Sequence, residues 1–405
     1  MLHRHLQNAL LEQINQNSVL YLNGPRQCGK STLVHSLKDI LDSDYITFDN
    51  YADLMRAQND PESFLQNSTK NLILNEVQLA PEIFRPLKML IDKQRLEGSK
   101  RKIILTGSVD IMTLPALSDA LVGRMSLLTL YPLSVSENLS RPKLNLLSLF
   151  EDGVQNFSAQ SLRWQDAVKL ASYPVLSVDS SIDTYPWFDG YITTLLQRDI
   201  RQLSNLDKMA EMPKIMNLLS SRIGNLSNDT NVAIESTLSL SSYRRYRSLL
   251  EAVFLIHFIE PWHSNLSKRL IKSPKLYFID TLLLTHIMRK PINTLDASDP
   301  YFGHIFENFV FSEILKCISG ERIKLYHYRD TNQVEVDFVL ENEYGEVVGI
   351  EAKTKAYITN KDLKNLKSFK EVCGAKFRRG YVMHSGSESY PLEYGFHALP
   401  VSALW

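Results

Sequence analysis

The chain has 405 residues, of which 44% are hydrophobic and 22% are charged, and its formal net charge is +0. This length is too great for one ordinary core, so we expect a globular protein of two or three domains. The balanced charge excludes a molecule whose overall field attracts nucleic acid, so any such affinity must come from local basic patches.

The N-terminus lacks the long apolar core of a signal peptide, and residues 1–16 instead have the pattern of an amphipathic helix. The most apolar later stretch, 249–259, is too short to span a bilayer and is interrupted by polar residues. The three cysteines show neither metal-ligand spacing nor a disulfide framework: Cys28, Cys317 and Cys373. These features predict a cytoplasmic protein with no membrane partner.

A glycine-rich segment between an apolar run at 18–22 and a helix predicts a nucleotide site. Its residues are Gly24, Pro25, Arg26, Gln27, Cys28, Gly29, Lys30, Ser31 and Thr32. The glycines let backbone N–H groups point at phosphate oxygens, and the following helix adds the positive end of its dipole. Lys30 is expected to reach the β- and γ-phosphates, and Ser31 to offer its hydroxyl to Mg²⁺. Cys28 is expected to fill a loop position rather than to act as a redox switch.

Four short apolar runs at 18–22, 44–48, 71–74 and 102–106 alternate with segments of helical periodicity. This pattern predicts a parallel sheet with helices on both faces, and ligands bind at the carboxyl ends of such strands. Candidate residues near those ends are Asn75, Glu76, Thr106, Ser108 and Arg124.

Each candidate has a role in nucleotide hydrolysis and a plain alternative. Asn75 stands where a nucleotide hydrolase would place an acidic residue near Mg²⁺, and Glu76 would orient the attacking water. Thr106 or Ser108 would sense the γ-phosphate, and Arg124 would stabilise transition-state charge. The alternatives are a surface glutamate, small polar residues that cap helices, and a solvated loop arginine.

The segment 142–298 is expected to be mainly helical, with helices at 187–203 and 239–258. A strand-like run follows at 276–279, and a helix followed by a strand is the element order of a winged helix. Its cations would meet DNA phosphates or guanine edges: Arg244, Arg245, Arg247, Lys268, Arg269 and Lys272. The alternative, a solvated face of a module packed on the N-terminal domain, stays open.

A second chemical group lies near the C-terminus, where strands at 333–340 and 347–353 flank a turn and predict a hairpin. Glu351 and Lys353 share one strand face, and pairing can bring Asp337 beside them. Glu307, on a helix at 305–317, could approach the same sheet. Asp337 and Glu351 would hold Mg²⁺ while Lys353 stabilises charge or a water, as in a metal-dependent phosphodiesterase. We predict that the four side chains converge and that repulsion raises at least one carboxyl pKa.

In its motifs and their order the chain resembles the AAA-type ATPases of bacteria and archaea that carry a C-terminal domain of unknown function numbered 4143. The matching segments are 24–32, 48–49, 75–78, 105–108, 123–124, 131–134, 275–280, 303–308 and 335–338. The resemblance implies ATP as the nucleotide and a winged-helix unit in the middle. The C-terminal arrangement resembles the restriction-endonuclease-like fold, with its Asp and Glu-x-Lys signature.

One departure from the family concerns Asn75, where the family usually has aspartate. An amide keeps a hydrogen bond but not the charge, and Mg²⁺ prefers anionic oxygen partners. Nucleotide binding should therefore survive better than hydrolysis.

These observations predict an α/β protein of three domains: a P-loop AAA-type ATPase domain at 1–141, a helical winged-helix domain at 142–298 and a restriction-endonuclease-like domain at 299–405. The expected function is ATP and Mg²⁺ binding with slow or conditional hydrolysis, coupled to a nuclease-like module directed at DNA or another nucleic acid. In the alternative, the chain is a nucleotide-gated scaffold whose C-terminal domain is inactive as a nuclease and binds a protein partner. An oligomer is compatible with the sequence.

Overall fold

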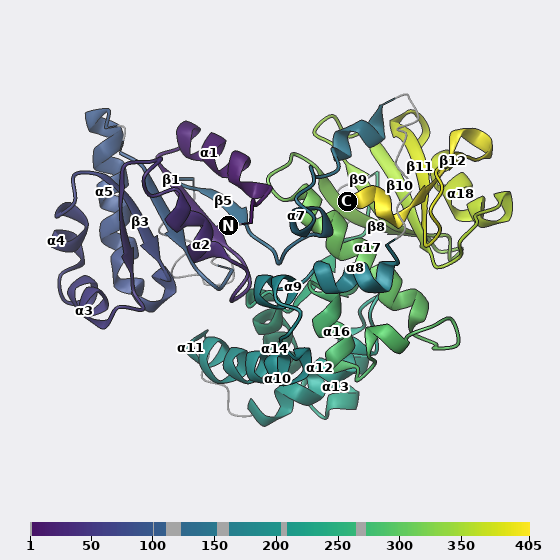
Figure 1. The fold of residues 1–405 in the computed structure, drawn as a ribbon, viewed down its shortest axis with the longest axis horizontal. Helices are drawn as coiled ribbons and strands as arrows, with labels where there is room; N and C mark the ends of the chain where they lie inside the picture. Colours follow the sequence, from purple (N-terminus) through teal and green to yellow (C-terminus); the bar gives the residue numbers. More distant parts are fainter. Residues whose placement is uncertain (1, 100, 111–122, 152–161, 204–208, 265–272) are drawn as a thin grey trace.

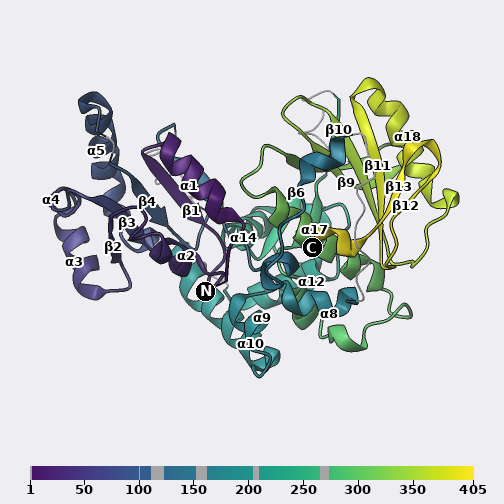
Figure 2. The same ribbon diagram turned by 45° about the horizontal axis from the view of Figure 1, so that its top comes forward.

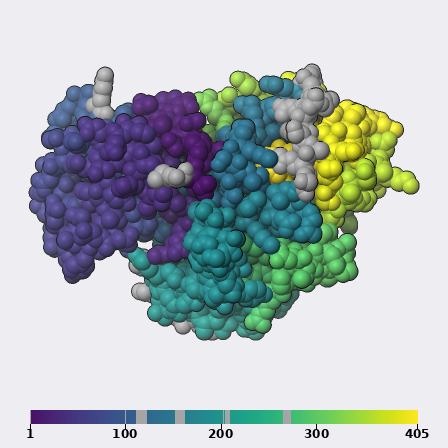
Figure 3. Space-filling model, in the orientation of Figure 1, coloured from purple at the N-terminus to yellow at the C-terminus, as the bar shows by residue number. Residues whose placement is uncertain are grey.

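In a computed structural model of the protein, the described residues are 2–99, 101–110, 123–151, 162–203, 209–264 and 273–405. They form an N-terminal part around a parallel sheet, a mainly helical middle part and a C-terminal part around a mixed sheet (Figure 1). The predicted α/β class is therefore confirmed. In the space-filling view of Figure 3, the teal surface of the middle part lies between the purple N-terminal and yellow C-terminal surfaces. None of the helices in these ranges is long and apolar enough to cross a bilayer.

Within the described residues, the N-terminal sheet has five parallel strands in the order β2-β3-β4-β1-β5. The strands are β1 (Val19–Asn23), β2 (Ser43–Thr47), β3 (Asn71–Asn75), β4 (Ile103–Thr106) and β5 (Ser126–Thr129). The four predicted strands match β1 to β4 to within one residue at either end, whereas β5 was not predicted. Because β1 lies between β4 and β5, the loop that follows it opens at the carboxyl edge of the sheet between these two strands.

Helices cover both faces of this sheet, as predicted (Figure 2). They are α1 (Leu6–Gln16), α2 (Lys30–Ser36), α3 (Tyr51–Asn59), α4 (Pro61–Gln66) and α5 (Phe84–Glu97). Alternate residues of β1 face opposite ways because a strand has a side-chain period of two. Val19 and Tyr21 belong to the core under α3, α4 and α5, and Leu20 and Leu22 belong to the core under α1 and α2.

The middle part is mainly helical. Its helices, with the short helix that leads into it, are α7 (Val135–Asn138), α8 (Trp164–Leu170), α9 (Pro174–Val178), α10 (Thr184–Thr194), α11 (Arg201–Leu203), α12 (Met212–Ser220), α13 (Asp229–Ser236), α14 (Leu240–Ala252) and α16 (Thr281–Ile287). A π-helical segment, η5 (Leu195–Ile200), joins α10 to α11, so the predicted helix at 187–203 is helical throughout but not regular.

A two-stranded antiparallel sheet follows α14, made of β6 (Ile256–Ile259) and β7 (Lys275–Phe278). The helix predicted over 239–258 is therefore wrong at its C-terminal end. Phe254 has φ 59, a left-handed conformation that ends the helix, and the chain continues as a buried strand. Apolar periodicity alone could not separate this short buried strand from one more helical turn.

Within the described residues, the C-terminal part has a six-stranded mixed sheet in the order β12-β13-β11-β10-β9-β8. Its strands are β8 (Lys324–Arg329), β9 (Glu335–Glu341), β10 (Val347–Lys353), β11 (Phe377–His384), β12 (Tyr390–Pro391) and β13 (His397–Pro400). The helices α17 (Phe302–Ile318) and α18 (Lys364–Cys373) pack on its two faces. The predicted hairpin is confirmed, since β9 and β10 pair antiparallel with Glu341 opposite Val347.

One apolar core runs without a break from the middle part into the C-terminal part. The helix α17 lies inside it, where Phe306 and Phe309 contact the Trp164 ring at centroid distances of 5.2 and 6.2 Å. Burial of these aromatic side chains holds the two parts together, because separating them would expose large aromatic surfaces. The boundary predicted between residues 298 and 299 stays a prediction, since packing crosses it.

Candidate functional site

The glycine-rich loop joins the end of β1 to the start of α2, as the sequence predicted. Gly24 has φ +146, and a Cβ there would lie 2.0 Å from the Leu130 carbonyl oxygen, so no other residue fits without moving β5. Gly29 has φ +101 at the N-cap of α2. The two glycines therefore give this loop the tight curvature that turns its backbone N–H groups inward.

The Lys30 side chain is folded over the loop. Its Nζ donates hydrogen bonds to the carbonyl oxygens of Gly24 at 2.9 Å and of Pro25 at 2.8 Å. Only 4% of this residue is exposed, so the ammonium is directed along the loop rather than into solvent. These two acceptors are neutral, and an anionic phosphate oxygen is a stronger partner for an ammonium.

The strand-end residues meet in one hydrogen-bond network. The Oδ1 atom of Asn75 accepts from Ser31 Oγ at 2.8 Å and from Thr106 Oγ1 at 2.7 Å. The Nδ2 atom of Asn75 donates to Thr47 Oγ1 at 3.1 Å. The geometry thus brings together Ser31, Asn75 and Thr106, which the sequence placed on three different segments, and it shows how an amide satisfies all of them.

Glu76 follows the network at the carboxyl end of β3. Its backbone has φ 60, an uncommon conformation for a non-glycine residue that turns its carboxylate toward the loop cavity. Its N–H donates to Thr106 Oγ1 at 3.3 Å, and its carboxylate accepts from Gln78 Nε2. The same Gln78 amide also donates to Ser108 Oγ at 3.1 Å. A water-orienting role for Glu76 fits this placement and stays a prediction.

Two adjoining cavities lie where the loop meets the middle part. The polar cavity has a volume of about 340 Å³ and is lined by Gln27, Gly29, Lys30, Ser31, Thr32, Glu76, Pro174, Val175 and Trp187. The apolar cavity, of about 280 Å³, shares three of these residues and is otherwise lined by Leu2, Arg4, Gln7, Leu33, Ser36, Leu133 and Val178. The helices α9 and α10 of the middle part therefore supply a wall of the site.

Ion pairs tie the middle part to the rim of the same loop. Arg26 Nη1 lies 3.0 Å from Asp199 Oδ1, and Arg198 pairs with Asp49 at 3.3 Å. Burial raises the pKa of Asp199, although Arg26 opposes the shift. Both Arg198 and Asp199 come from the π-helical segment η5, which turns adjacent residues toward two different segments of the N-terminal part. Sequence patterns predicted a helix here but gave no signal for its π-helical form or for these contacts.

Arg4 is a second contact that the sequence did not reveal. Its guanidinium donates to the carbonyl oxygens of Cys28 and Tyr131, each at 2.7 Å, and to Glu137 Oε1 at 3.0 Å. Arg4 is 6% exposed, so it forms a buried link between the phosphate loop and the start of the middle part.

All three cysteines, Cys28 included, are free and buried.

Arg124 lies away from this site. Its side chain pairs with Asp92 at 2.8 Å. It precedes β5, whose first residues pair with the start of β1, whereas Thr129 at its end lies opposite Asn23 next to the loop. In a parallel sheet this puts Arg124 at the amino edge, opposite the nucleotide edge. The predicted placement of Arg124 near the carboxyl ends of the strands is therefore wrong, and its role in stabilising transition-state charge stays a prediction.

Two of the predicted nucleic-acid cations are held by one acidic partner. Arg244 and Arg247 both pair with Asp229, at 3.2 and 2.8 Å, and Arg247 also lies 4.0 Å from the centre of the Phe258 ring. Lys268, Arg269 and Lys272 lie outside the described residues. These ion pairs favour the alternative of a packed module, and nucleic-acid binding through this patch stays a prediction.

Two of the C-terminal candidates, Glu307 and Asp337, meet at a cation that belongs to the protein. The Nζ atom of Lys275, on β7, lies 3.0 Å from Glu307, 3.1 Å from Asp337 and also pairs with Glu335. Beside this group, Lys353 pairs with Glu351 at 2.8 Å. We call the following five residues the carboxylate cluster: Lys275, Glu307, Glu335, Asp337 and Glu351.

The electrostatics of the cluster follow from its burial. Burial raises the pKa of Glu307 and of Glu351 to about 7, with the neighbouring Asp337 charge adding to both shifts. Burial would also raise the pKa of Asp337, but Lys275 and Lys353 together hold it below its ordinary value. The predicted rise of at least one carboxyl pKa therefore has burial as its main cause, with repulsion second.

The metal ligands predicted at Asp337 and Glu351 stay a prediction. Among the described residues, no group of three or more His, Cys, Asp or Glu side chains is arranged to hold a metal ion. The Lys275 ammonium lies between Glu307 and Asp337 and pairs with both. No sequence pattern connected Lys275, which lies in the predicted middle domain, with the C-terminal strands.

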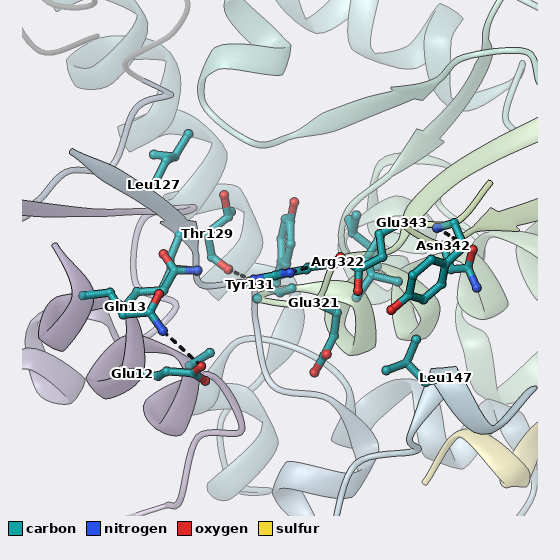
Figure 4. A pocket seen from close by; sticks show the side chains of 18 residues that line it. Glu12, Gln13, Leu127, Thr129, Tyr131, Leu147, Glu321, Arg322, Asn342 and Glu343 are labelled. Atoms are coloured by element: carbon teal, nitrogen blue, oxygen red, sulfur yellow. Dashed lines mark hydrogen bonds and ion pairs between the residues drawn. The ribbon is translucent and has the colours of Figure 1, made fainter. Parts of the chain in front are cut away.

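A further cavity of about 670 Å³ separates the N-terminal part from the C-terminal part (Figure 4). It is bordered by α1, by β5 at the sheet edge and by the turn between β9 and β10. Its charged side chains include Arg322 and Glu343, which pair at 3.0 Å. None of the predicted site residues lines it.

Three family models match this chain: an AAA domain at residues 16–139, a domain of unknown function (DUF8612) at 172–294 and a domain of unknown function (DUF4143) at 302–404. The chain therefore carries an N-terminal AAA domain and a C-terminal DUF4143 domain. The phosphate loop lies in the AAA match, and Lys275 and Glu307 lie on opposite sides of the gap between the other two matches.

Relatives of this AAA–DUF4143 chain include two uncharacterized proteins, Rv2008c of Mycobacterium tuberculosis and Mb2031c of Mycobacterium bovis. Each is 25% identical over 395 residues, which cover 98% of this chain and 82% of the relative. Among solved structures, the chain is similar to the Walker-type ATPase PABY2304 of Pyrococcus abyssi, with 14% identity, a TM-score of 0.40 and coverage of 69% of this chain and 94% of that one. It is also similar to the RuvB Holliday junction branch migration motor of Thermotoga maritima, with 13% identity, a TM-score of 0.30 and coverage of 63% and 89%.

Proposed function

We propose that this protein binds ATP with Mg²⁺ between its AAA domain and its middle part, and that it hydrolyses ATP slowly. The observation that carries the proposal is the phosphate loop facing a polar cavity that α9 and α10 close from the other side. The apolar cavity next to it suits an adenine ring, because its lining is largely aliphatic and it shares Gly29, Thr32 and Pro174 with the polar cavity.

Each residue of the polar cavity has a definite part in this proposal. The backbone N–H groups of the loop and the Lys30 ammonium bind the β- and γ-phosphates. Ser31 offers its hydroxyl to Mg²⁺, and the bound ion supplies positive charge where the phosphates develop negative charge. Glu76 orients the attacking water, and Thr106 contacts the γ-phosphate.

Slow turnover follows from the network around Asn75. In the proposal, the Mg²⁺ site has the Ser31 hydroxyl and the Asn75 amide on the protein side, and neither carries charge. Mg²⁺ held mainly by phosphate oxygens and waters is placed less firmly than one that is also held through a carboxylate. Binding of ATP depends on the loop and Lys30, so it should be strong even where hydrolysis is slow.

Nucleotide occupancy should alter how the middle part sits on the AAA domain. The walls supplied by Pro174, Val175 and Trp187, and the ion pair of Arg26 with Asp199, all adjoin the loop. A bound triphosphate brings negative charge next to Arg26, which competes with Asp199 for the guanidinium. The AAA domain and the middle part would thus respond together to ATP.

Tryptophan fluorescence tests the location of this site. Of the 4 tryptophans, Trp187 is the one that lines the polar cavity. Addition of ATP and MgCl₂ should change the emission of the native protein, and the change should vanish in Trp187→Phe and in Lys30→Ala. A change that persists in Trp187→Phe would place the nucleotide elsewhere.

The predicted nucleic-acid and protein partners, the winged-helix assignment, the oligomer and the cytoplasmic location stay predictions. Within the described residues, the three helices α12, α13 and α14 followed by the β6–β7 pair have the element order of a winged helix. Any DNA binding through α14 should fall steeply with added salt and should weaken in Arg244→Ala.

A further inference from the structure

We infer that the ammonium group of Lys275 serves as the built-in cation of the carboxylate cluster, so that the DUF4143 domain clamps the middle part instead of holding a catalytic metal. This inference is independent of the proposed ATP site, which shares no residue with the cluster. It rests on the position of Lys275, which reaches Glu307, Glu335 and Asp337 at once and is 1% exposed.

The point between Glu307, Glu335 and Asp337 is already occupied by a cation. Two of the three carboxylates place oxygens at 3.0 and 3.1 Å from the same Nζ atom, the spacing of a charge-assisted hydrogen bond. A Mg²⁺ ion would need oxygens at about 2.0–2.1 Å in a near-octahedral shell at that same point. The ammonium and a divalent ion therefore compete for one position.

The charge state of the lysine supports the same role. Burial favours the neutral amine, but Glu307 and the neighbouring acidic groups hold the pKa of Lys275 well above its ordinary value. The Tyr277 hydroxyl, on the same face of β7, donates to Glu307 at 2.6 Å. Lys275 is thus a permanent cation for carboxylates that would otherwise repel one another.

A second set of contacts holds the same strand in place. The Asn308 side chain, on α17, accepts from the Phe278 N–H at 2.8 Å and donates to the Phe278 carbonyl at 3.0 Å. The backbone of β7 is therefore bonded to the helix that also carries Glu307. Charge and backbone contacts together join a strand of the middle part to the DUF4143 domain.

Removal of the ammonium gives a direct test. Lys275→Met keeps the length of the side chain and leaves three carboxylates around an empty point, so the variant should acquire a divalent-cation site. Without nucleotide, MnCl₂ should raise its melting temperature by roughly 3 °C or more. The native protein should show no such response, and neither should Lys316→Met, whose lysine is also buried but pairs with Glu313 on another part of α17.

A double variant shows which residues produce the response to MnCl₂, and it keeps the test valid if Lys275→Met does not fold. Lys275→Met combined with Asp337→Asn should lose the response to MnCl₂, because one carboxylate of the cluster becomes neutral. If Lys275→Met alone does not fold, that double variant, with less uncompensated charge, should recover solubility. The inference is overturned if a folded Lys275→Met variant does not respond to MnCl₂. It is also overturned if Lys275→Met does not fold and the double variant does not recover solubility. Mn²⁺ binding, or Mn²⁺-dependent cleavage of DNA, by the native protein that disappears in Asp337→Asn would overturn it as well.

Discussion

Substitution of Asn75 by aspartate is expected to speed ATP hydrolysis. The two side chains have the same shape, and the Oδ1 atom can keep its bonds from Ser31 at 2.8 Å and Thr106 at 2.7 Å. The lost donation to Thr47 can be replaced, because the Thr47 hydroxyl can turn to donate to the new oxygen. The substitution therefore changes the charge beside Ser31 more than it changes the packing.

The size of the effect follows from the change in hydrogen-bond type. A hydrogen bond to a charged group contributes about 1.5–3 kcal/mol, against about 0.5–1.5 kcal/mol for a neutral pair. The midpoints of these ranges differ by about 1.3 kcal/mol, which corresponds to roughly a tenfold change in an equilibrium or rate constant. We expect the Mg²⁺ concentration at half-maximal rate to fall roughly tenfold and kcat to rise by a similar factor.

Phosphate release measured across a range of MgCl₂ concentrations tests this expectation, with ATP affinity measured in parallel by calorimetry. ATP affinity should change by no more than about threefold, because the loop and Lys30 are untouched. Asn67→Asp is the matched control, since it adds the same charge at an exposed position outside the site. If the native protein already turns over as fast as Asn75→Asp, another group supplies the charge and the argument fails.

Three further substitutions have definite expected outcomes. Glu76→Gln should lower the remaining hydrolysis by at least about 100-fold with little change in ATP affinity, and an unchanged rate would remove Glu76 from catalysis. Gly24→Ala should unfold or greatly destabilise the AAA domain, because its Cβ would lie 2.0 Å from the Leu130 oxygen, whereas Gly190→Ala, where nothing lies within 4 Å, should be tolerated. Burial raises the pKa of Glu351 from 4.5 to about 7, so the native protein retains a proton that the unfolded chain releases and loses stability as pH rises through that window. Glu351→Gln should reduce the fall in urea-unfolding free energy between pH 5 and pH 8 by up to about 3 kcal/mol, and an equal fall would contradict the assignment.

The parts of the fold that the sequence predicted are those whose cause is local. The strand before the phosphate loop, the loop itself and the hairpin of β9 and β10 each combine a periodic apolar pattern with turn residues at fixed spacing. The strand end at Asn75 was predictable for a similar reason, because a short apolar run ends there and the parallel sheet places it beside Ser31. The edge strand β5 was missed because Ser126–Thr129 is short and half polar.

The contacts that the sequence did not predict depend on distant segments meeting. Arg124 follows a glycine, as a catalytic arginine could, but strand direction puts it at the wrong edge of the sheet. Lys275 begins a strand on the same face as Tyr277, and a lysine at the head of a buried strand was the one available signal of an internal partner. The π-helical turn that aims Asp199 at Arg26 has no sequence pattern of its own.

The central claim is that ATP and Mg²⁺ bind at the loop between Gly24 and Thr32, and calorimetric titration of ATP in MgCl₂ tests it most directly. The native protein should bind one ATP per chain. Lys30→Ala should weaken binding by at least about 30-fold, since it removes a charge-assisted contact of about 2 kcal/mol or more. Lys70→Ala, which removes a lysine paired with Asp42 outside the site, should bind as the native protein does. Undiminished affinity in Lys30→Ala would contradict the account.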